Sequence, residues 1–309
     1  MKAIEINSFG GPEVLQVTEI PEPTPKSGEV LVSLHTASVN PADSKVRQGT
    51  GAGAANVTFP YIIGRDFSGV IKACGEDVIE FKPGDAVFGV LPVGVEGTYL
   101  EALTIEASVI APKPETMSHA EAAALALSGL TSLVAIEDTL ELQAGERILI
   151  QGGAGGVGNF AVQLAHHLGA EVITTASPAN HDYLRDLGAN QVIDYNTQDF
   201  TEVLSDIDVV FDLIGGEVHQ RSFEVLKPNG RLAYIAPLLK NAEPPRDDIT
   251  VMRPKVGRDR PHLLRIIDLY ETGAIIAPDI QTLPLEEAGK AHDLVDTHHV
   301  RGKIVLQIK

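Results

Sequence analysis

From about Ser118 onward, the chain alternates stretches of strand length with stretches of helical spacing. The β-branched run RILIQGG at 147–153 is followed by the helical pattern GVGNFAVQLAHHLGA at 156–170 and then by EVITTAS at 171–177. Similar pairs continue to residue 236. Alternation of this kind is typical of a parallel sheet with helices on both faces, so this part of the chain predicts a doubly wound α/β domain.

The first 118 residues have a different texture, with short apolar runs separated by Gly and Pro. Strands at such spacing predict an all-β unit. Ser118 and Glu121 form a capping-box pattern, which places a helix start and the domain boundary there. The strand-like runs of this first part span 29–40, 69–74, 85–90 and 99–114.

Three later segments complete the outline. Residues 240–261 are rich in Pro, Arg and Asp and predict a loop region that holds one strand at most. The pattern HLLRIIDLYETG at 262–273 predicts a last helix. The tail ends in KIVLQI at 303–308, a strand that we expect to return to the first domain.

Length and charge limit the classes of function. The 309 residues suit two domains of roughly 150 residues each. With 24 basic and 42 acidic residues the net charge is 24 − 42 = −18, which argues against nucleic-acid and membrane-surface binding. Cys74 is the single cysteine, so no internal disulfide is possible. The start of the sequence shows no apolar signal region, and uninterrupted apolar runs are shorter than the ~18 residues of a membrane span. We therefore expect a soluble, cytoplasmic protein.

A glycine-rich turn joins the first strand and helix of the second part. Gly153, Gly155 and Gly158 satisfy the pattern G-x-G-x-x-G, between a β-branched strand and an amphipathic helix. The first glycine permits the tight turn, the second lets the backbone approach a pyrophosphate, and the third lets helix and strand pack closely. The helix N-terminus offers free N–H groups to the phosphates. The pattern predicts a dinucleotide site; a purely structural turn is the alternative.

The end of the second strand bears on the choice of dinucleotide. NAD sites carry an Asp or Glu about 20 residues after the turn to bind the ribose 2′-hydroxyl. Here the strand ends Thr175-Ala176-Ser177, without an acid. Small hydroxyl residues admit a 2′-phosphate, so the sequence favours NADPH over NADH. Alternatively, Ser177 only caps the next helix.

The sequence lacks the residues of a zinc site. Zinc takes about three or four protein ligands, usually from Cys, His and Glu. Where metal-dependent alcohol dehydrogenases have a Gly-His-Glu segment, this chain reads Gly64-Arg65-Asp66. We therefore expect no metal. Without a Lewis acid, a substrate that is already electrophilic, such as a quinone or an enone, fits best.

A set of motifs, in order, covers nearly the whole chain. It resembles the zinc-independent quinone oxidoreductases and zeta-crystallins of the medium-chain dehydrogenase/reductase superfamily. The segment TASVNPADSKVRQG (36–49) is similar to their Asn-x-x-Asp-x-x-x-Arg-x-Gly stretch. The other matching blocks are PYIIGRDFSGV (60–70), KPGDAVFG (82–89), EAAALALSGLTSL (121–133), ERILIQGGAGGVGNFAVQLA (146–165), DVVFDLIGGE (208–217) and RGKIVL (301–306).

This resemblance implies a fold of class α/β. A GroES-like β-barrel catalytic domain would span 1–118 with a C-terminal return at 275–309, and a Rossmann NADP(H)-binding domain 119–274. The family reduces quinones or the C=C bond of α,β-unsaturated carbonyls with NADPH, usually as a homodimer, and binds the cofactor in the cleft between its domains. The residues expected at the cofactor are Thr131, Gly153, Gly155, Gly156, Val157, Gly158, Ser177, Tyr195 and Lys303.

The candidate catalytic residues are donors for the enolate oxygen that develops during reduction. They are Asn40, Lys45 and Arg47, and the Gly/Ala-rich segment 49–57 is predicted to form a lip over the substrate. Each has a structural alternative. Asn40 would cap a turn, Arg47 would pair with Asp43 on a helix surface, and Lys45 would be solvated.

Several departures and rivals stay open. Many quinone oxidoreductases have Tyr at the position of Lys45 and a lysine just after the second strand, where this chain reads SPANHDYLR. Tyr195 would alternatively be a core residue with a wet hydroxyl. Two other functions also fit the motifs: an enoyl-thioester reductase of lipid or polyketide metabolism, and a non-catalytic NADPH-binding protein.

Overall fold

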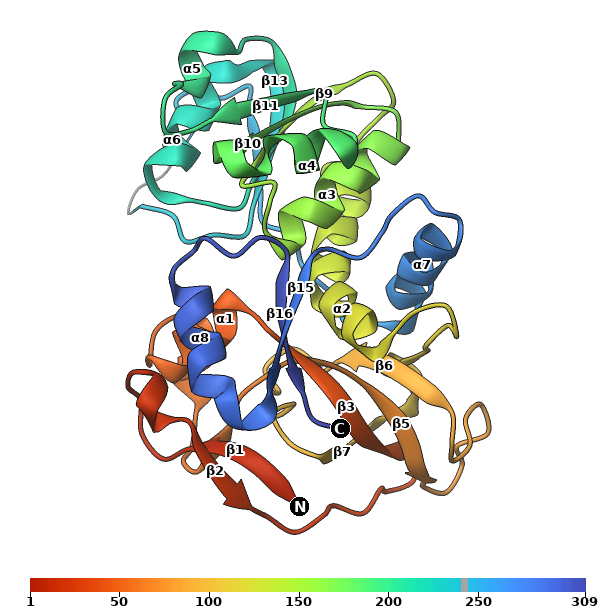
Figure 1. Cartoon of the computed structure of the whole chain (residues 1–309). Helices are drawn as coiled ribbons and strands as arrows, with labels where there is room; N and C mark the ends of the chain where they lie inside the picture. Colours follow the sequence, from red (N-terminus) through yellow and green to blue (C-terminus); the bar gives the residue numbers. More distant parts are fainter. Residues whose placement is uncertain (240–243) are drawn as a thin grey trace. The chain divides into compact units, whose positions relative to one another are not determined.

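The computed structural model describes residues 1–239 and 244–309 (Figure 1). By contacts the chain forms two compact units. Unit 1 comprises Met1–Leu127, Arg258–Glu271 and Ala277–Lys309, and unit 2 comprises Ser128–Gly257 and Thr272–Ile276. The contact-based division therefore differs from the boundaries at 118 and 274, which stay a prediction.

Unit 2 contains a parallel sheet in the order β11-β10-β9-β12-β13-β14. Numbered along the unit, this is the order 3-2-1-4-5-6 of the Rossmann fold, as the alternating pattern predicted. The first strand, β9, lies at the centre between β10 and β12, and every pairing is parallel. The strands are β9 (Arg147–Gln151), β10 (Glu171–Ala176), β11 (Gln191–Asp194), β12 (Ile207–Asp212), β13 (Leu226–Tyr234) and β14 (Thr250–Met252).

Helices connect these strands. The core of unit 2 includes Leu149, Ile173 and Val210, one from each of the three central strands, all with no exposed surface. Burial on both faces explains why these strands read as continuous apolar runs rather than as alternating patterns. The helices are α3 (Gly156–His167), α4 (His181–Asp186), α5 (Phe200–Val203) and α6 (Gly216–Val225), with the short 3₁₀ helix η5 (Pro178–Asn180) before α4.

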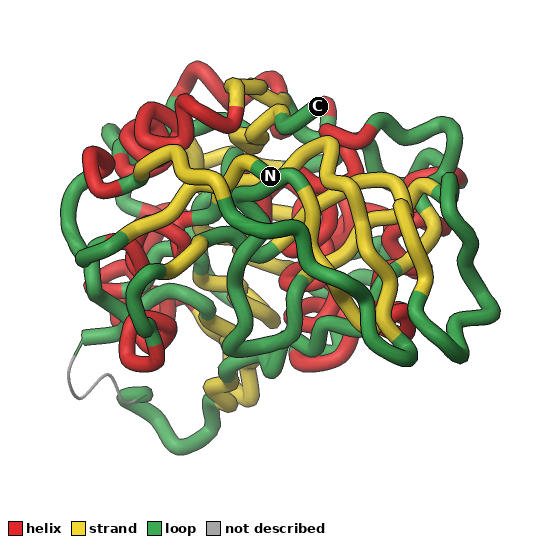
Figure 2. Tube along the Cα trace, turned by 90° about the horizontal axis from the view of Figure 1, so that it is seen from below, coloured by secondary structure: helices red, strands yellow, loops and turns green. Residues whose placement is uncertain are grey.

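Unit 1 is built on a mainly antiparallel sheet in the order β15-β16-β3-β5-β6-β8, with β7 also paired to β3. A second small sheet has the order β2-β1-β4. Both chain ends belong to this unit, and Figure 2 marks the two termini. The strands are β1 (Lys2–Ile6), β2 (Gln16–Glu19), β3 (Glu29–Val39), β4 (Tyr61–Ile62), β5 (Asp66–Cys74), β6 (Ala86–Val90), β7 (Ala102–Glu106), β8 (Ala111–Pro112), β15 (Ile280–Pro284) and β16 (Lys303–Gln307).

The last strand returns to the first domain, as predicted. Strand β16 pairs antiparallel with β3, and Ile304 faces Val39 in the register. Three helices belong wholly to unit 1: α1 (Pro41–Arg47), α7 (Arg260–Glu271) and α8 (Ala288–Asp296). Turns of 3₁₀ helix are η1 (Pro12–Val14), η2 (Ala52–Asn56), η3 (Ala107–Val109) and η6 (Leu285–Glu287). The predicted lip at 49–57 contains η2.

Helix α2 (His119–Leu133) begins where the capping pattern placed it. The backbone N–H of Ser118 donates to Glu121 Oε2 at 2.7 Å, and that of Glu121 donates to Ser118 Oγ at 3.2 Å. The π-helical turn η4 (Val134–Thr139) continues it. By length and mean composition alone, His119–Thr139 could cross a membrane, which the lengths of uninterrupted apolar runs did not indicate. Of its most apolar 18-residue stretch, 78% is buried, as in the core helices of soluble proteins.

The segment predicted as loop holds one strand, β14, and its last two residues open helix α7. Residues 240–243 lie outside the described part of the chain. Helix α7 runs from Arg260 to Glu271, two residues earlier than the pattern at 262–273 predicted.

Replacing Gly158 with Ala tests the packing of α3 on β9. The added Cβ would lie 2.2 Å from Gly152 O and 2.7 Å from Gly153 Cα, backbone atoms that cannot rotate away. We expect Gly158→Ala to lower the free energy of unfolding by about 1–3 kcal/mol. Gly155→Ala is the matched control, since its Cβ would meet no atom within 4 Å. Urea unfolding of both variants measures the difference; equal stabilities would contradict the packing argument.

Candidate functional site

In the glycine turn between β9 and α3, one glycine, Gly155, has free space beside its Cα. A Cβ on Gly153 would lie 2.2 Å from Thr174 Oγ1, whereas a Cβ on Gly155 would have no heavy atom within 4 Å. Gly152 has φ +85°, a conformation that favours glycine. The turn therefore packs tightly against the sheet on one side and has free space over Gly155 on the other.

Helix α3 begins at this open position. Gly155 is its N-cap, with φ −76° and ψ 171°, and its carbonyl accepts the first helical hydrogen bond, from Asn159 N at 2.7 Å. The N–H groups of Gly156, Val157 and Gly158 precede that bond and have no acceptor within the helix. No acidic side chain stands in the first turn. Free donors, a positive helix end and open space above Gly155 fit the diphosphate of a dinucleotide.

Ser177 and Tyr195 follow neighbouring strands of the same sheet. Ser177 is half-buried and its Oγ accepts from Asn180 Nδ2 at 3.2 Å. It stands at the N-cap position of η5, but its side chain makes no capping bond. Tyr195 comes directly after β11 and is 52% exposed, so the alternative that it is a core residue was wrong. Thr131 lies in α2 and is buried. Their contact with a cofactor stays a prediction.

Asn40 and Lys303, predicted for different roles, bind each other in unit 1. Lys303 Nζ donates to Asn40 Oδ1 at 2.7 Å and to Val39 O at 3.1 Å. Because the amide oxygen faces the lysine, the amide nitrogen faces away, and Nδ2 donates to Asp66 Oδ1 at 3.1 Å. Both side chains are buried, and burial lowers the pKa of Lys303. Lys303 therefore fixes the orientation of the Asn40 amide.

A cluster of buried charges surrounds this pair. Asp43 Oδ2 accepts from the backbone N–H of Asn40 at 2.8 Å and from the hydroxyl of Tyr99 at 3.3 Å. Its Oδ1 lies 3.5 Å from Arg65 Nε. Arg65 in turn donates from Nε to Glu96 Oε1 at 2.9 Å. Burial raises the pKa of Asp43 to about 7, and the Arg65 charge opposes the shift.

The other two catalytic candidates on α1 differ in exposure. The side chain of Arg47 is 1% exposed and its Nη2 binds Asp296 Oδ2 of α8 at 2.7 Å. It does not pair with Asp43 on a helix surface, so that alternative was wrong. Its Nε and Nη1 have no hydrogen-bond partner among the described residues, and the role of Arg47 as a donor stays a prediction. Lys45 is half-buried beside the predicted lip, where a Cβ on Gly51 would lie 3.7 Å from Lys45 Cβ.

Comparison with curated proteins gives relatives that align along the whole chain. The mitochondrial NAD(P)H oxidoreductase RTN4IP1 of Mus musculus is 31% identical, and the match covers 100% of this chain and 89% of that protein. The chloroplastic NADPH-dependent alkenal/one oxidoreductase of Arabidopsis thaliana is 30% identical, covering 99% of this chain and 79% of that protein.

Solved structures and family models agree with these relatives. The quinone oxidoreductase from Coxiella burnetii has a TM-score of 0.94 at 34% identity, covering 100% of this chain and 99% of that chain. This chain belongs to the quinone oxidoreductase-like medium-chain dehydrogenases/reductases. Residues 26–115 match the alcohol dehydrogenase GroES-like domain, and residues 187–306 match the zinc-binding dehydrogenase model. The predicted fold and family are confirmed.

One further similar structure was solved with a bound dinucleotide. The Escherichia coli quinone oxidoreductase complexed with NADPH has a TM-score of 0.89 at 27% identity, and each chain covers 100% of the other.

The zinc implied by one family model does not fit the side chains of this member. An arginine has no lone pair to give a metal ion, and Arg65 stands at the position where the resemblance to metal-dependent alcohol dehydrogenases would place a histidine ligand. Residues 1–239 and 244–309 contain no group of three or more His, Cys, Asp or Glu side chains arranged to hold a metal. We derive no step through zinc.

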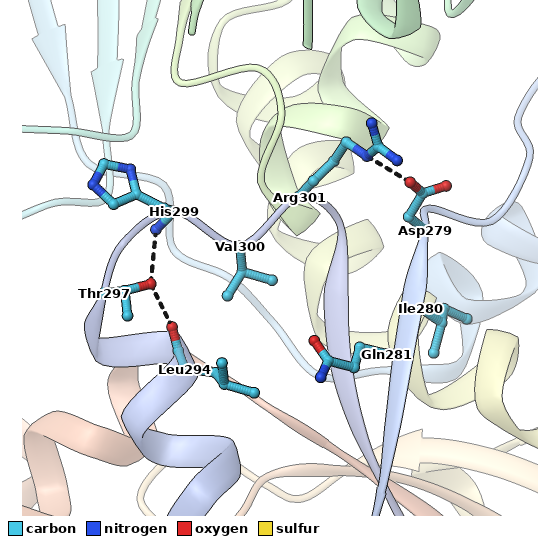
Figure 3. A pocket seen from close by; sticks show the side chains of 8 residues that line it. All are labelled: Asp279, Ile280, Gln281, Leu294, Thr297, His299, Val300 and Arg301. Carbon is cyan, nitrogen blue, oxygen red and sulfur yellow. Dashed lines mark hydrogen bonds and ion pairs between the residues drawn. The ribbon is translucent and has the colours of Figure 1, made fainter. Parts of the chain in front are cut away.

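An open cavity of about 600 Å³ lies beside β15, β16 and α8 in unit 1 (Figure 3). Arg301 Nε binds Asp279 Oδ2 at 2.5 Å across its rim. Thr297 Oγ1 donates to Leu294 O at 2.7 Å and accepts from His299 N at 3.2 Å. Because these polar groups bind one another, we assign the cavity no ligand. Its lining residues are Asp279, Ile280, Gln281, Leu294, Thr297, His299, Val300 and Arg301.

Sequence reasoning missed several members of the buried cluster. Asp66, Glu96 and Tyr99 were not singled out as site residues, although the opposite charges Arg65-Asp66 at the start of a strand were a visible signal. His292 of α8 was also missed. Its Nε2 lies 3.2 Å from the Tyr99 hydroxyl, and burial lowers its pKa to about 4.

Gly155→Ala tests whether the glycine turn at the N-terminus of α3 binds the dinucleotide diphosphate, separately from its effect on stability. The Cβ would occupy the space through which a pyrophosphate approaches the backbone. We expect the dissociation constant for NADPH to rise at least about tenfold, a loss of about 1.4 kcal/mol. Calorimetric titration of wild type and variant measures it; unchanged affinity would place the dinucleotide elsewhere.

Asp43→Asn tests the charge state of the cluster. An unfolded Asp releases its proton near pH 3.8, whereas folded Asp43 keeps it until about pH 7. The folded state therefore binds more protons in this window, and Asp43 makes wild type less stable as pH rises from about 4 to 7. Asparagine has no such titration. We expect the stability of the variant relative to wild type to increase over this range, by urea unfolding at several pH values; a flat difference would contradict the raised pKa.

Proposed function

We propose that this protein is an NADPH-dependent reductase of quinones or α,β-unsaturated carbonyl compounds that acts by hydride transfer without zinc. The observation that carries the proposal is the open space over Gly155 at the N-terminus of α3. Relatives named as a quinone oxidoreductase complexed with NADPH and as an NADPH-dependent alkenal/one oxidoreductase support it.

The preference for NADPH over NADH is part of the proposal. Strand β10 ends at Ala176 and is followed by Ser177, whose hydroxyl carries no charge to repel a 2′-phosphate. His181 lies close by, with Nε2 3.3 Å from Ala176 O. Arg185 forms a solvent-exposed ion pair with Asp182 at 2.8 Å. The preference for NADPH is therefore supported more by the absence of a carboxylate directly after β10 than by any basic residue nearby.

Bound NADPH would supply the hydride, and the chain's own residues would position the substrate. The carbonyl oxygen gains negative charge as the β-carbon is reduced, so a hydrogen-bond donor near that oxygen lowers the barrier. Lys45, half-buried next to the 49–57 lip, is one candidate donor. Lys303 acts indirectly, because it holds the amide of Asn40 in one orientation.

The setting of the reaction also belongs to the proposal. We propose a cytoplasmic homodimer that acts on a small electrophilic molecule and binds neither nucleic acid nor membrane. The net charge of −18 supports the latter part, and the family resemblance supports the dimer.

A turnover assay tests the function. We expect purified protein with NADPH to reduce 1,4-benzoquinone or an alkyl vinyl ketone, measured as loss of reduced-nicotinamide absorbance, and to use NADH less well. Lys45→Ala should lower turnover if its ammonium is the donor. Absence of turnover across a broad panel of enones and quinones would refute the reductase proposal, and tighter binding of NADH would refute the reading of Ser177.

A further inference from the structure

The sequence predicted Asn40 as a donor to the substrate, but both hydrogens of its side-chain amide already have acceptors. Lys303 binds Oδ1 at 2.7 Å, which fixes the direction of the amide. The two N–H bonds of a primary amide then point at Asp66 Oδ1, 3.1 Å from Nδ2, and at Asp43 Oδ2, 3.4 Å away. Both acceptors are buried carboxyl groups. A substrate oxygen would have to displace one of them, so Asn40 is poorly placed to donate to it.

Arg65 retains hydrogens to donate. A guanidinium has five N–H bonds. Nε and Nη2 both bind Glu96 Oε1, and Nε also lies 3.5 Å from Asp43 Oδ1. Within the described ranges 1–239 and 244–309, Nη1 has no hydrogen-bond acceptor. The side chain is 14% exposed, in contrast to the wholly buried Asp43 that it contacts.

Arg65 and Asn40 belong to the same small region of unit 1. Asp43 links them, because its Oδ2 accepts from Asn40 N at 2.8 Å while its Oδ1 faces Arg65. The lip crosses the guanidinium at a residue without a side chain, since a Cβ on Gly53 would lie 3.4 Å from Arg65 Nη2. The backbone of the lip therefore lies close to Arg65 Nη2.

Two acidic side chains, Glu96 and Asp43, hold the guanidinium in place. Glu96 accepts from two of its nitrogens, which fixes the plane of the group, and Asp43 faces Nε from another side. The donor is thus oriented before any substrate arrives, as preorganised oxyanion donors are. A guanidinium also stays protonated throughout the physiological range, whereas a lysine ammonium can lose its proton when buried.

We propose that Arg65 donates the hydrogen bond that stabilises the substrate's oxyanion, in the role that the sequence assigned to Asn40. The inference rests on the proposed reductase function. The β-carbon of an enone gains a hydride from the reduced nicotinamide, which is left oxidised as NADP⁺. The C=C π pair shifts so that negative charge develops on the carbonyl oxygen, where Arg65 binds it. The α-carbon then takes a proton from water.

The test removes the Arg65–Glu96 pair as a unit. The double variant Arg65→Met/Glu96→Gln removes both charges of the pair, and Asp43 keeps its hydrogen bonds from Asn40 N and the Tyr99 hydroxyl. Its matched control is Arg231→Met/Glu146→Gln, which removes an Arg–Glu pair 2.7 Å apart in unit 2. We expect kcat for an alkyl vinyl ketone to fall roughly 10²–10³-fold in the first variant. The NADPH dissociation constant and the unfolding midpoint should match those of the control, which keeps its kcat.

Substrate dependence separates a donor from a structural residue. The fold-loss in kcat should be smaller for 1,4-benzoquinone, whose reduced oxygens stabilise negative charge better by themselves, than for the ketone. An equal loss for all substrates, or no loss, would overturn the role of Arg65. If the double variant does not fold, Arg65→Lys keeps the charge toward Glu96 but not the fork of donors; unchanged kcat in that variant would overturn the proposal.

A binding experiment tests the same proposal without measuring turnover. 4-Nitrophenolate is a planar oxyanion, and calorimetry with NADP⁺ present should show its affinity falling at least about tenfold in the Arg65→Met/Glu96→Gln variant but not in the control. Equal affinity in the two variants, or no binding to wild type, would count against Arg65. Phenolate binding through Arg65 without turnover of any quinone or enone would refute the reductase proposal alone.

Discussion

The close approach of Gly158 to the backbone of Gly152 and Gly153 sets the position of α3 on the sheet. It brings the N-terminus of the helix to the carboxyl end of β9, the strand that lies between β10 and β12 at the centre of the sheet. Gly155 then stands at the N-cap with open space above it. The positions of Ser177 and Tyr195 follow from the same sheet, because they come directly after β10 and β11, the two strands on one side of β9. The proposed dinucleotide site of this unit thus depends first on a close backbone approach that leaves no space for a side chain at residue 158.

In unit 1 the main constraint on the candidate site is electrostatic rather than steric. Asp43, Asp66 and Lys303 are all buried, and charges in such a place need partners. The cluster supplies them: Lys303 and Asp66 bind the two ends of the Asn40 amide, while Arg65 lies between Glu96 and Asp43. Each partner limits what the others can do. The contacts that orient Asn40 use both of its amide hydrogens. The contacts that orient Arg65 use Nε and Nη2 and leave other N–H groups to donate.

The fold could be predicted from the sequence because its signals are local. Strand and helix periods, the capping pair Ser118–Glu121 and the spacing of three glycines each span fewer than about 20 residues. The candidate site was harder, because its contacts are distant in the sequence. Lys303 and Asn40 are 263 residues apart, and Arg47 and Asp296 are 249 apart. No local pattern shows that an amide is turned by a lysine, or that an arginine on a short helix points into the core. The exposure of Tyr195 likewise depends on what packs after β11.

The pairing of β16 with β3 has a consequence for how the molecule forms. Strand β3 ends at Val39, and its neighbour β16 begins only at Lys303. During synthesis β7 can pair with Glu29–Ser33 of β3 early, whereas Thr36–Val39 must stay unpaired on the β16 side until the ribosome has passed Lys303. Unit 2, whose sheet strands all lie between Arg147 and Met252, can close earlier. An exposed strand edge is a template for unwanted association, so the interval before β16 docks is when a nascent chain of this kind most needs a chaperone.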